Sequence, residues 1–213
     1  MNQELRFIEC TSPSCRFRFP SDGDLLRVHY CPKCGSRTKL YSYKHPNVSK
    51  PSPLLFNWLH REYVAVLDNI RSIYNVGSIF RTSDGFGIDK LFLCGITSTP
   101  ANIKFHKTSL GSESNLKWEY HNNCVLLCQS LIDEGYLLIC LENDNSAIDI
   151  NNFSLREDDK KVAVIVGNEK AGIDPEILTI SHQAISIPMA GIKESFNVSV
   201  AFGIMLYHLM SSW

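Results

Sequence analysis

The sequence predicts an α/β protein with a mainly parallel β-sheet, preceded by a small cysteine-rich module. Four closely spaced cysteines stand before residue 35, and short apolar runs alternate with helical stretches from Tyr63 onward. Such alternation indicates parallel strands covered by helices on both faces. Between Lys44 and Pro53, three prolines and two serines mark an extended linker. We therefore expect a cysteine module at 1–43, a linker at 44–62 and a larger domain at 63–213.

The first segment has the cysteine spacing of a structural zinc site. Cys10, Cys15, Cys31 and Cys34 form the pattern C-x4-C-x15-C-x2-C. Two short cysteine turns that fold together place four thiolates tetrahedrally, as Zn²⁺ prefers, and leave no open coordination position. Two disulfides are the alternative, which a reducing cytoplasm disfavours, and His29 is an alternative ligand. We predict a zinc ribbon whose metal holds the fold and does no chemistry.

The remaining cysteines have no metal spacing. Cys94, Cys124, Cys128 and Cys140 lie inside apolar segments. We expect them to behave as small buried apolar residues.

Charge is distributed unevenly along the chain. Residues 1–62 hold ten Lys and Arg against five Asp and Glu, which gives +5; because the whole chain is −1, the remainder is −6. A basic segment is typical of a module that binds polyanions, although basic residues also keep small zinc modules soluble. Arg16, Phe17, Arg18 and Phe19 alternate directly after Cys15. Since arginines grip phosphates and aromatic rings stack on unpaired bases, we expect the ribbon to recruit RNA.

Membrane insertion is not expected. The first ten residues carry charges and no apolar run, and the longest apolar stretch, Val198–Met210, is interrupted by polar residues. A bilayer crossing needs about 20 apolar residues. We expect a soluble, cytoplasmic protein without a membrane partner.

The elements of the larger domain follow from its apolar runs and helical periodicity. A short apolar helix is expected before it, at Leu54–Leu59. Strands are expected at Tyr63–Leu67, Lys90–Cys94, Leu137–Leu141, Val162–Val166 and Ala184–Ile187. Helices are expected at Val76–Asp84, Asn123–Glu134, Pro175–Ser181 and Phe196–Met210.

Three glycine- and asparagine-rich patches follow predicted strands, where ligands bind in open α/β sheets. The first contains Asn75, which we expect to cap a helix, and Arg81 further along that helix. An arginine beside a cleft can hold a phosphate with two hydrogen bonds. The alternative is a surface pair of Arg81 with Asp84, which contributes little.

The second patch, Gly167-Asn-Glu169-Lys-Ala-Gly172, follows the most apolar strand. Gly167 indicates a close backbone approach at the strand end, and Glu169 then lies beside it. A loop with a helix-capping acid is the alternative. The patch is neither a dinucleotide fingerprint nor a phosphate-binding loop, because their glycine spacings are absent.

The third patch runs from Ile187-Pro-Met189 to Ser195-Phe196-Asn197. A strand stops at the proline, a glycine-containing loop turns, and a final helix begins. Helix capping explains either Ser195 or Asn197, since both residue types are usual at that position, but not both together.

In order and spacing, the three patches resemble those of the SpoU-type (TrmH-like) branch of the SPOUT RNA methyltransferases. Lys107–Glu113 also looks like a segment common in that family. The departures are Phe196, where the family usually has Leu, and Gly85-Phe86, where it often has Ala-Val. Phe196 would reshape an adenine pocket, and neither departure removes a polar functional group.

The resemblance implies a domain with a C-terminal trefoil knot that binds S-adenosylmethionine, with an active site at a homodimer interface. It places the cofactor against Gly167, Ile187, Met189 and Phe196. It implies a catalytic set of Asn75, Arg81, Glu169, Ser195 and Asn197.

The implied reaction is methyl transfer to a ribose 2′-hydroxyl of tRNA or rRNA, with RNA and not DNA as partner. The family mechanism makes Arg81 the proton acceptor, which is awkward because a guanidinium keeps its proton in proteins. The alternative is that Arg81 holds the phosphate and the 2′-oxygen. Two other functions stay open: methylation of a base nitrogen, and a zinc-ribbon RNA-binding protein whose knot domain is catalytically silent.

Overall fold

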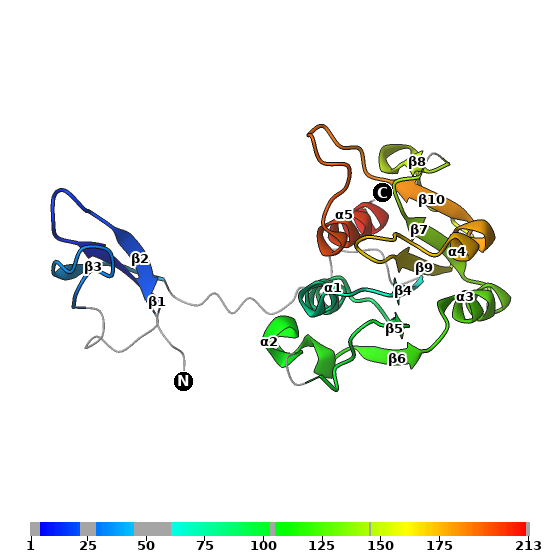
Figure 1. Cartoon of the computed structure of the whole chain (residues 1–213), viewed down its shortest axis with the longest axis horizontal. Coiled ribbons are helices and arrows are strands. Elements are labelled where there is room, and N and C mark those ends of the chain that lie inside the picture. Colours follow the sequence, from blue (N-terminus) through cyan, green and yellow to red (C-terminus); the bar gives the residue numbers. More distant parts are fainter. Residues whose placement is uncertain (1–4, 22–28, 45–60, 103–104, 145, 212–213) are drawn as a thin grey trace. The chain divides into compact units, whose positions relative to one another are not determined.

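The computed structural model describes residues 5–21, 29–44, 61–102, 105–144 and 146–211. The chain divides into two compact units, residues 1–55 and 56–213 (Figure 1). The division falls within the segment predicted as a linker. The short helix expected at Leu54–Leu59 lies outside the described residues.

The first unit contains a three-stranded antiparallel sheet. Its strands are β1 Leu5–Cys10, β2 Arg18–Ser21 and β3 Thr38–Lys44. β1 is the central strand and pairs with both others. We call this unit the ribbon.

The second unit is built on a seven-stranded sheet in which every strand pairing is parallel, as predicted. The strand order is β6-β5-β4-β9-β7-β10-β8. The strands are β4 Glu62–Asp68, β5 Lys90–Cys94, β6 Lys117–His121, β7 Leu137–Leu141, β8 Ile148–Asp149, β9 Lys161–Val166 and β10 Gln183–Ser186. Five of them match the predicted strands, while β6 and β8 were not predicted.

Helices cover both faces of this sheet (Figure 1). They are α1 Ile73–Phe86, α2 His106–Ser109, α3 Cys124–Asp133, α4 Pro175–Ile180 and α5 Val198–Ser211, with two short 3₁₀ turns at Ser112–Ser114 and Ile150–Asn152. One apolar core joins α1 and α5 to the sheet, and a second joins α3 and α4 to its other face. Successive strand residues alternate between the cores: Ala65 belongs to the first and Val66 to the second.

Two helices begin two or more residues from their predicted start, and α3 begins one residue late, at Cys124. Asn75 does not cap α1: the helix starts at Ile73, and the Ser72 side chain accepts the Asn75 N–H. α5 starts at Val198 rather than Phe196, and the Asn197 side chain accepts the Ser199 N–H at 3.0 Å. Asn197 is therefore the residue that caps the final helix. Asn197 directly precedes the first helical residue, Val198, which is the usual position of a capping residue.

Candidate cofactor and catalytic site

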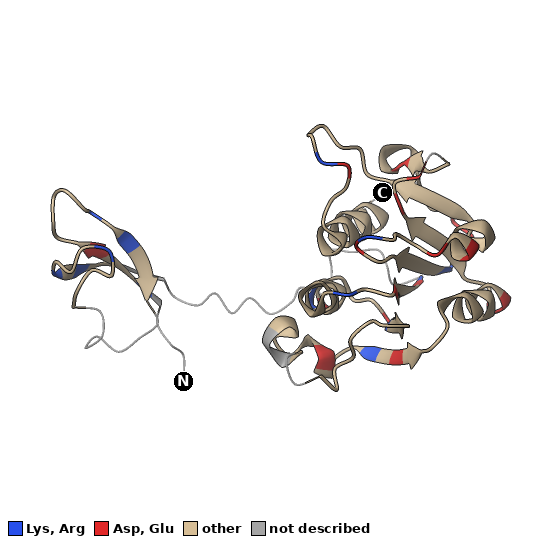
Figure 2. Cartoon of the chain, in the orientation of Figure 1, with Lys and Arg blue, Asp and Glu red and all other residues tan. Residues whose placement is uncertain are grey.

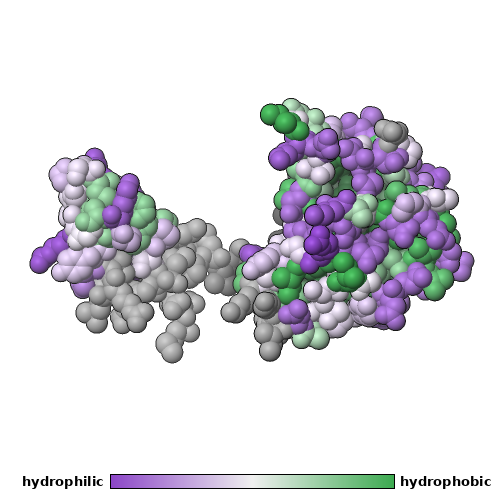
Figure 3. Space-filling model, in the orientation of Figure 1, coloured by the Kyte–Doolittle hydropathy of each residue, from purple (hydrophilic) through white to green (hydrophobic). Residues whose placement is uncertain are grey.

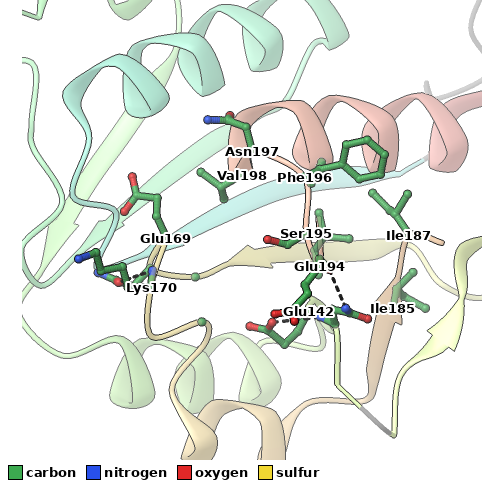
Figure 4. A pocket seen from close by; sticks show the side chains of 16 residues that line it. Glu142, Glu169, Lys170, Ile185, Ile187, Glu194, Ser195, Phe196, Asn197 and Val198 are labelled. Carbon is green, nitrogen blue, oxygen red and sulfur yellow. Dashed lines mark hydrogen bonds between the residues drawn. The ribbon is translucent and has the colours of Figure 1, made fainter. Parts of the chain in front are cut away.

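A cavity of about 300 Å³ opens at the carboxyl ends of β7, β9 and β10. Ile185, Ile187 and Phe196 form an apolar part of its lining, while Glu142 and Ser195 bring polar groups to it (Figure 4). Ligand cavities are expected at this edge of an open α/β sheet. The predicted location of the site is thus where the structure has a cavity.

Gly167 directly follows β9, where two backbone segments meet. A Cβ atom at this position would lie 2.4 Å from the carbonyl carbon of Gly172 and from the nitrogen of Ile173. The loop turns back on itself through two hydrogen bonds of 2.9 Å between the backbones of Asn168 and Gly172. The expected close approach is present, and the approaching group is the loop's own backbone, so no side chain fits at Gly167.

Glu169 is the centre of a hydrogen-bond network that joins three distant segments. Its carboxylate accepts the backbone N–H groups of Arg71 and Ser72 at 2.9 Å each and the side-chain amide of Asn75 at 2.8 Å. Asn75 in turn accepts the side-chain amide of Asn197 at 3.0 Å. The network ties the loop after β9 to the start of α1 and to the cap of α5.

The same hydrogen bonds set the charge state of this carboxyl. Burial raises the pKa of Glu169, but the N–H groups of Arg71 and Ser72 and the Asn75 amide favour the carboxylate and lower the pKa overall. Glu169 does not cap the helix that follows it, because Asp174 caps α4. It binds instead to the segment that leads into α1.

Arg81 stands apart from this network. It is exposed on α1, six residues after Asn75, which corresponds to about 9 Å along a helix axis. Within the described ranges its side chain forms no hydrogen bond or ion pair, so the alternative pairing with Asp84 is absent. The structure therefore brings together three of the five predicted catalytic residues. It leaves Arg81 facing solvent and Ser195 at the cavity without a bond to them.

Three of the four predicted cofactor residues, Gly167, Ile187 and Phe196, line the cavity. Met189 is half-buried and lies outside the lining.

Sequence reasoning missed Glu142 and Asn143, which also line the cavity. The Glu142 carboxylate accepts the Ile173 N–H at 2.9 Å, and the Asn143 amide donates to the Glu194 carbonyl at 2.9 Å. These bonds connect the loop after β7 to both other loops around the cavity. The signal was available, because both residues directly follow a predicted strand.

The ribbon holds a separate cluster of four thiols. All four Sγ atoms of the predicted ligands lie within 4.8 Å of one another, with Cys10 and Cys34 at 3.5 Å and Cys15 and Cys31 at 3.8 Å. Thiolates around a tetrahedral zinc ion lie about 3.8 Å apart, since each Zn–S bond is about 2.3 Å. None of the four is in a disulfide, and the mutual proximity of all four Sγ atoms favours one metal site over two separate bridges. His29 is not part of the cluster.

The thiols differ in how readily they lose a proton. The Ser36 hydroxyl and N–H lower the pKa of Cys34 to about 6. Burial raises the pKa of Cys10 to about 12. A metal bound here at neutral pH would displace the Cys10 proton, as thiolate ligation requires.

The other four cysteines are buried in the second unit, as predicted. Cys94, Cys124, Cys128 and Cys140 all belong to the core between the sheet and helices α3 and α4.

A model of the SpoU rRNA Methylase family matches residues 62–207. The chain belongs to the SpoU rRNA Methylase family. The matched residues contain all three patches on which the resemblance rested, so that prediction is confirmed. The match leaves out the ribbon.

The SpoU rRNA Methylase domain of this chain is similar to proteins with an assigned activity and to proteins of known structure. A tRNA (guanosine(18)-2′-O)-methyltransferase of Aquifex aeolicus is 31% identical over 147 residues, which cover 69% of this chain and 68% of that protein. The crystal structure of the A. aeolicus TrmH/SpoU tRNA modifying enzyme has a TM-score of 0.63 and 28% identity, covering 71% of this chain and 76% of that one.

An AdoMet-bound rRNA methyltransferase from Sinorhizobium meliloti has a TM-score of 0.64 and 26% identity, covering 69% of this chain and 55% of that one. This chain therefore spans little more than half of that protein. The parallel α/β fold expected for a SpoU domain is confirmed, and the knotted path of its C-terminal segment stays a prediction. Among the described residues, none of the helices has the length and apolar character that a membrane crossing requires.

Proposed function

We propose that this chain transfers the methyl group of S-adenosylmethionine to a ribose 2′-hydroxyl of tRNA or rRNA. The observation that carries the proposal is the cavity at the carboxyl edge of the sheet, bordered by the bonded set of Glu169, Asn75 and Asn197. The A. aeolicus relative named for 2′-O-methylation of tRNA and the AdoMet-bound S. meliloti structure support it.

The cavity suits an adenosine-containing cofactor. Its volume of about 300 Å³ lies at the lower end of the range for small-molecule sites. Ile187 and Phe196 offer an apolar surface to the adenine ring, and Glu142 and Asn143 bring hydrogen-bonding groups to the same space. When bound, the cofactor supplies a methyl group on a positively charged sulfur.

The protein must position the ribose 2′-oxygen and remove its proton. Arg81 cannot readily accept a proton, because a guanidinium stays charged in proteins. We infer that it holds the adjacent phosphate and the 2′-oxygen. Ser195, at the cavity surface, hydrogen-bonds the cofactor or the ribose. Glu169, Asn75 and Asn197 are positioning residues, because their bonds fix the loops around the cavity.

A homodimer is part of the proposal. Tyr74 and Arg81 are seven residues apart on α1 and therefore share a face. Val200 and Tyr207 have the same spacing on α5, which packs against α1. Tyr74, Val200 and Tyr207 are 73%, 50% and 62% exposed. Contact of this apolar face with a second copy would enclose Arg81, which one chain leaves in solvent.

A structural Zn²⁺ in the ribbon completes the proposal. The four thiols form a closed set with the spacing of a tetrahedral site, and a thiolate metal site suits the reducing cytoplasm in which we place the protein. The metal would hold the ribbon and take no part in methyl transfer.

The test uses the full-length chain loaded with zinc. Calorimetry should detect S-adenosylmethionine binding, and labelled methyl groups should enter tRNA or rRNA as 2′-O-methylated nucleosides. Arg81→Ala should lower transfer by about 10²–10³-fold, the usual loss when one group that stabilises a reacting oxygen is removed. Its cofactor affinity should stay unchanged.

The matched control is Arg156→Ala. Arg156 is an exposed arginine that precedes β9, at the opposite end of that strand from the cavity. Its loss should leave transfer near the wild-type rate. Base-methylated product, absent cofactor binding or full activity of Arg81→Ala would each contradict the proposal.

A further inference from the structure

One face of the ribbon sheet gathers cations around a single acid. Glu9 in the central strand pairs with Arg18 of β2 on one side and with Lys39 of β3 on the other. Directly paired residues point to the same face of a sheet. Arg16 reaches the Glu9 carboxylate at 3.9 Å. We call Arg16, Arg18, Lys39 and Tyr41, with Glu9 between them, the basic face.

The basic face contains a preformed stack. The guanidinium carbon of Arg18 lies 3.5 Å from the ring centroid of Tyr41, although β1 separates their two strands. The Tyr41 residue is 56% exposed. Such a cation–π pair fixes both planar groups before any ligand arrives, which lowers the entropy cost of stacking a further planar group.

The stack lies on the opposite face from the buried Ile8. Ile8 pairs with Phe19 and Leu40, which therefore share its face of the sheet. Phe17 and Phe19 stack on each other with ring centroids 5.5 Å apart. Tyr41 is thus on the same side as the charged residues and not on the side of this apolar group.

Charge favours a polyanion at this face. Three cations surround one carboxylate, so the basic face carries a net +2. The Glu9 side chain is 11% exposed and that of Arg16 is 75% exposed, so a ligand meets the cations first. Figure 2 shows a blue basic segment on β2, and Figure 3 shows hydrophobic residues bordered by hydrophilic ones on the visible side of the ribbon.

We propose that the basic face binds an unpaired segment of the substrate RNA, with a base stacked on the Arg18–Tyr41 pair and neighbouring phosphates held by Arg16 and Lys39. This inference rests on the proposed function for the identity of the RNA. Planar stacking suits an exposed base, which a duplex or an acidic peptide does not present. The rest of the chain is acidic, with a net charge of −6 beyond residue 62. The ribbon therefore supplies the electrostatic attraction for RNA that the second unit lacks.

The experiment measures binding of a fluorescent oligouridine strand, and of a blunt-ended RNA duplex, to full-length zinc-loaded protein. Tyr41→Ala should weaken binding of the single strand about 5- to 100-fold, the usual effect of losing one base-stacking ring. Arg18→Ala should weaken it similarly, because the stacking pair loses its other planar group, whereas Lys39→Ala should reduce the salt dependence by about one phosphate contact. Binding of the duplex should change less in Tyr41→Ala and Arg18→Ala.

Leu40→Ala is the matched control. Leu40 is next to Tyr41 on the same strand, is 41% exposed and points to the other face. The Leu40→Ala variant should bind the oligouridine strand as tightly as the wild type does, and zinc content should be unchanged in all variants. With bulk RNA, Tyr41→Ala should raise KM and leave kcat and cofactor affinity unchanged.

Two results would overturn the inference: wild-type strand affinity in both Tyr41→Ala and Arg18→Ala, or an equal loss in Leu40→Ala. Failure of the proposed function is a different result, because the oligouridine assay needs no methyl transfer. A protein that binds the strand through Tyr41 and methylates nothing would refute the proposed function alone.

Discussion

The ribbon and the second unit bury very different interiors. In the second unit both faces of the sheet are closed by apolar side chains, and Ala65, Leu67 and Val66 have no exposed surface. In the described part of the ribbon the buried hydrophobic residues are Ile8, Cys10 and Cys31. Two of these three are predicted metal ligands. The second unit is therefore stabilised by burial of apolar surface, whereas we propose that the ribbon depends on a metal held by its thiol cluster.

This difference in how the two units are stabilised also suits them to different tasks. The cavity and the Glu169 network need loops held in fixed positions, and a rigid sheet with two cores provides that. A small sheet around a metal can leave its outer face open for contacts, since little of that face is needed for its own packing.

Metal removal is the largest expected difference between the units. A chelator, or Cys31→Ser, should unfold the ribbon, because structural zinc contributes about 10–16 kcal/mol of binding free energy to such modules. Amide NMR signals of the ribbon should collapse while those of the second unit and its thermal transition persist. Cys128→Ala removes a thiol outside the cluster and should keep full zinc content. A ribbon that keeps dispersed signals without metal would refute this division.

A substitution that leaves a void in the apolar core should lower the stability of the second unit alone. Phe80 is fully buried in α1 and meets Phe105 edge-on at 4.9 Å between ring centroids. Phe80→Ala should lower the free energy of unfolding of this unit by about 3–5 kcal/mol. Phe17→Ala is the comparison on the ribbon, where the ring is 38% exposed. It should leave the transition of the second unit unchanged, and an equal loss in both variants would mean that the units unfold together.

The fold was predictable where burial is complete. The strands β5 and β7 were predicted with their observed bounds, because β7 is an unbroken apolar run and β5 is one after its first residue, Lys90. The edge strand β6 has the sequence KWEYH, whose charged residues hide it from a search for apolar runs. β8 has two residues, too few for any periodicity. Edge strands need only one neighbour and face solvent, so their sequences carry a weaker signal.

Individual residues of the site could be predicted from the sequence, but the hydrogen bonds that join them could not. Patterns in the chain indicated Asn75, Glu169 and Asn197, yet hydrogen bonds across 94 and 122 positions join them in space. Capping was assigned to Asn75, although Ser72 caps the helix, because the apolar period alone fixes a helix start only within a few residues. In the proposed homodimer Arg81 meets the second copy, and a pattern within one chain cannot predict that contact.

The smallest expected effect concerns the carboxylate that links loops in the second unit, much as the thiol cluster links turns in the ribbon. Glu169 has a lowered pKa in the folded chain because of the N–H groups of Arg71 and Ser72 and the Asn75 amide, which outweigh its burial. Its stabilising contribution is therefore complete above the ordinary carboxyl pKa of about 4.3 and is lost as pH falls through the lowered value. Glu169→Gln keeps the shape and removes the charge. At neutral pH it should lower stability by at most about 1 kcal/mol, since the side chain is largely in solvent. Melting both proteins across this range should show the difference at pH 7 shrinking towards zero in acid, and a difference independent of pH would mean that the charge of Glu169 contributes nothing.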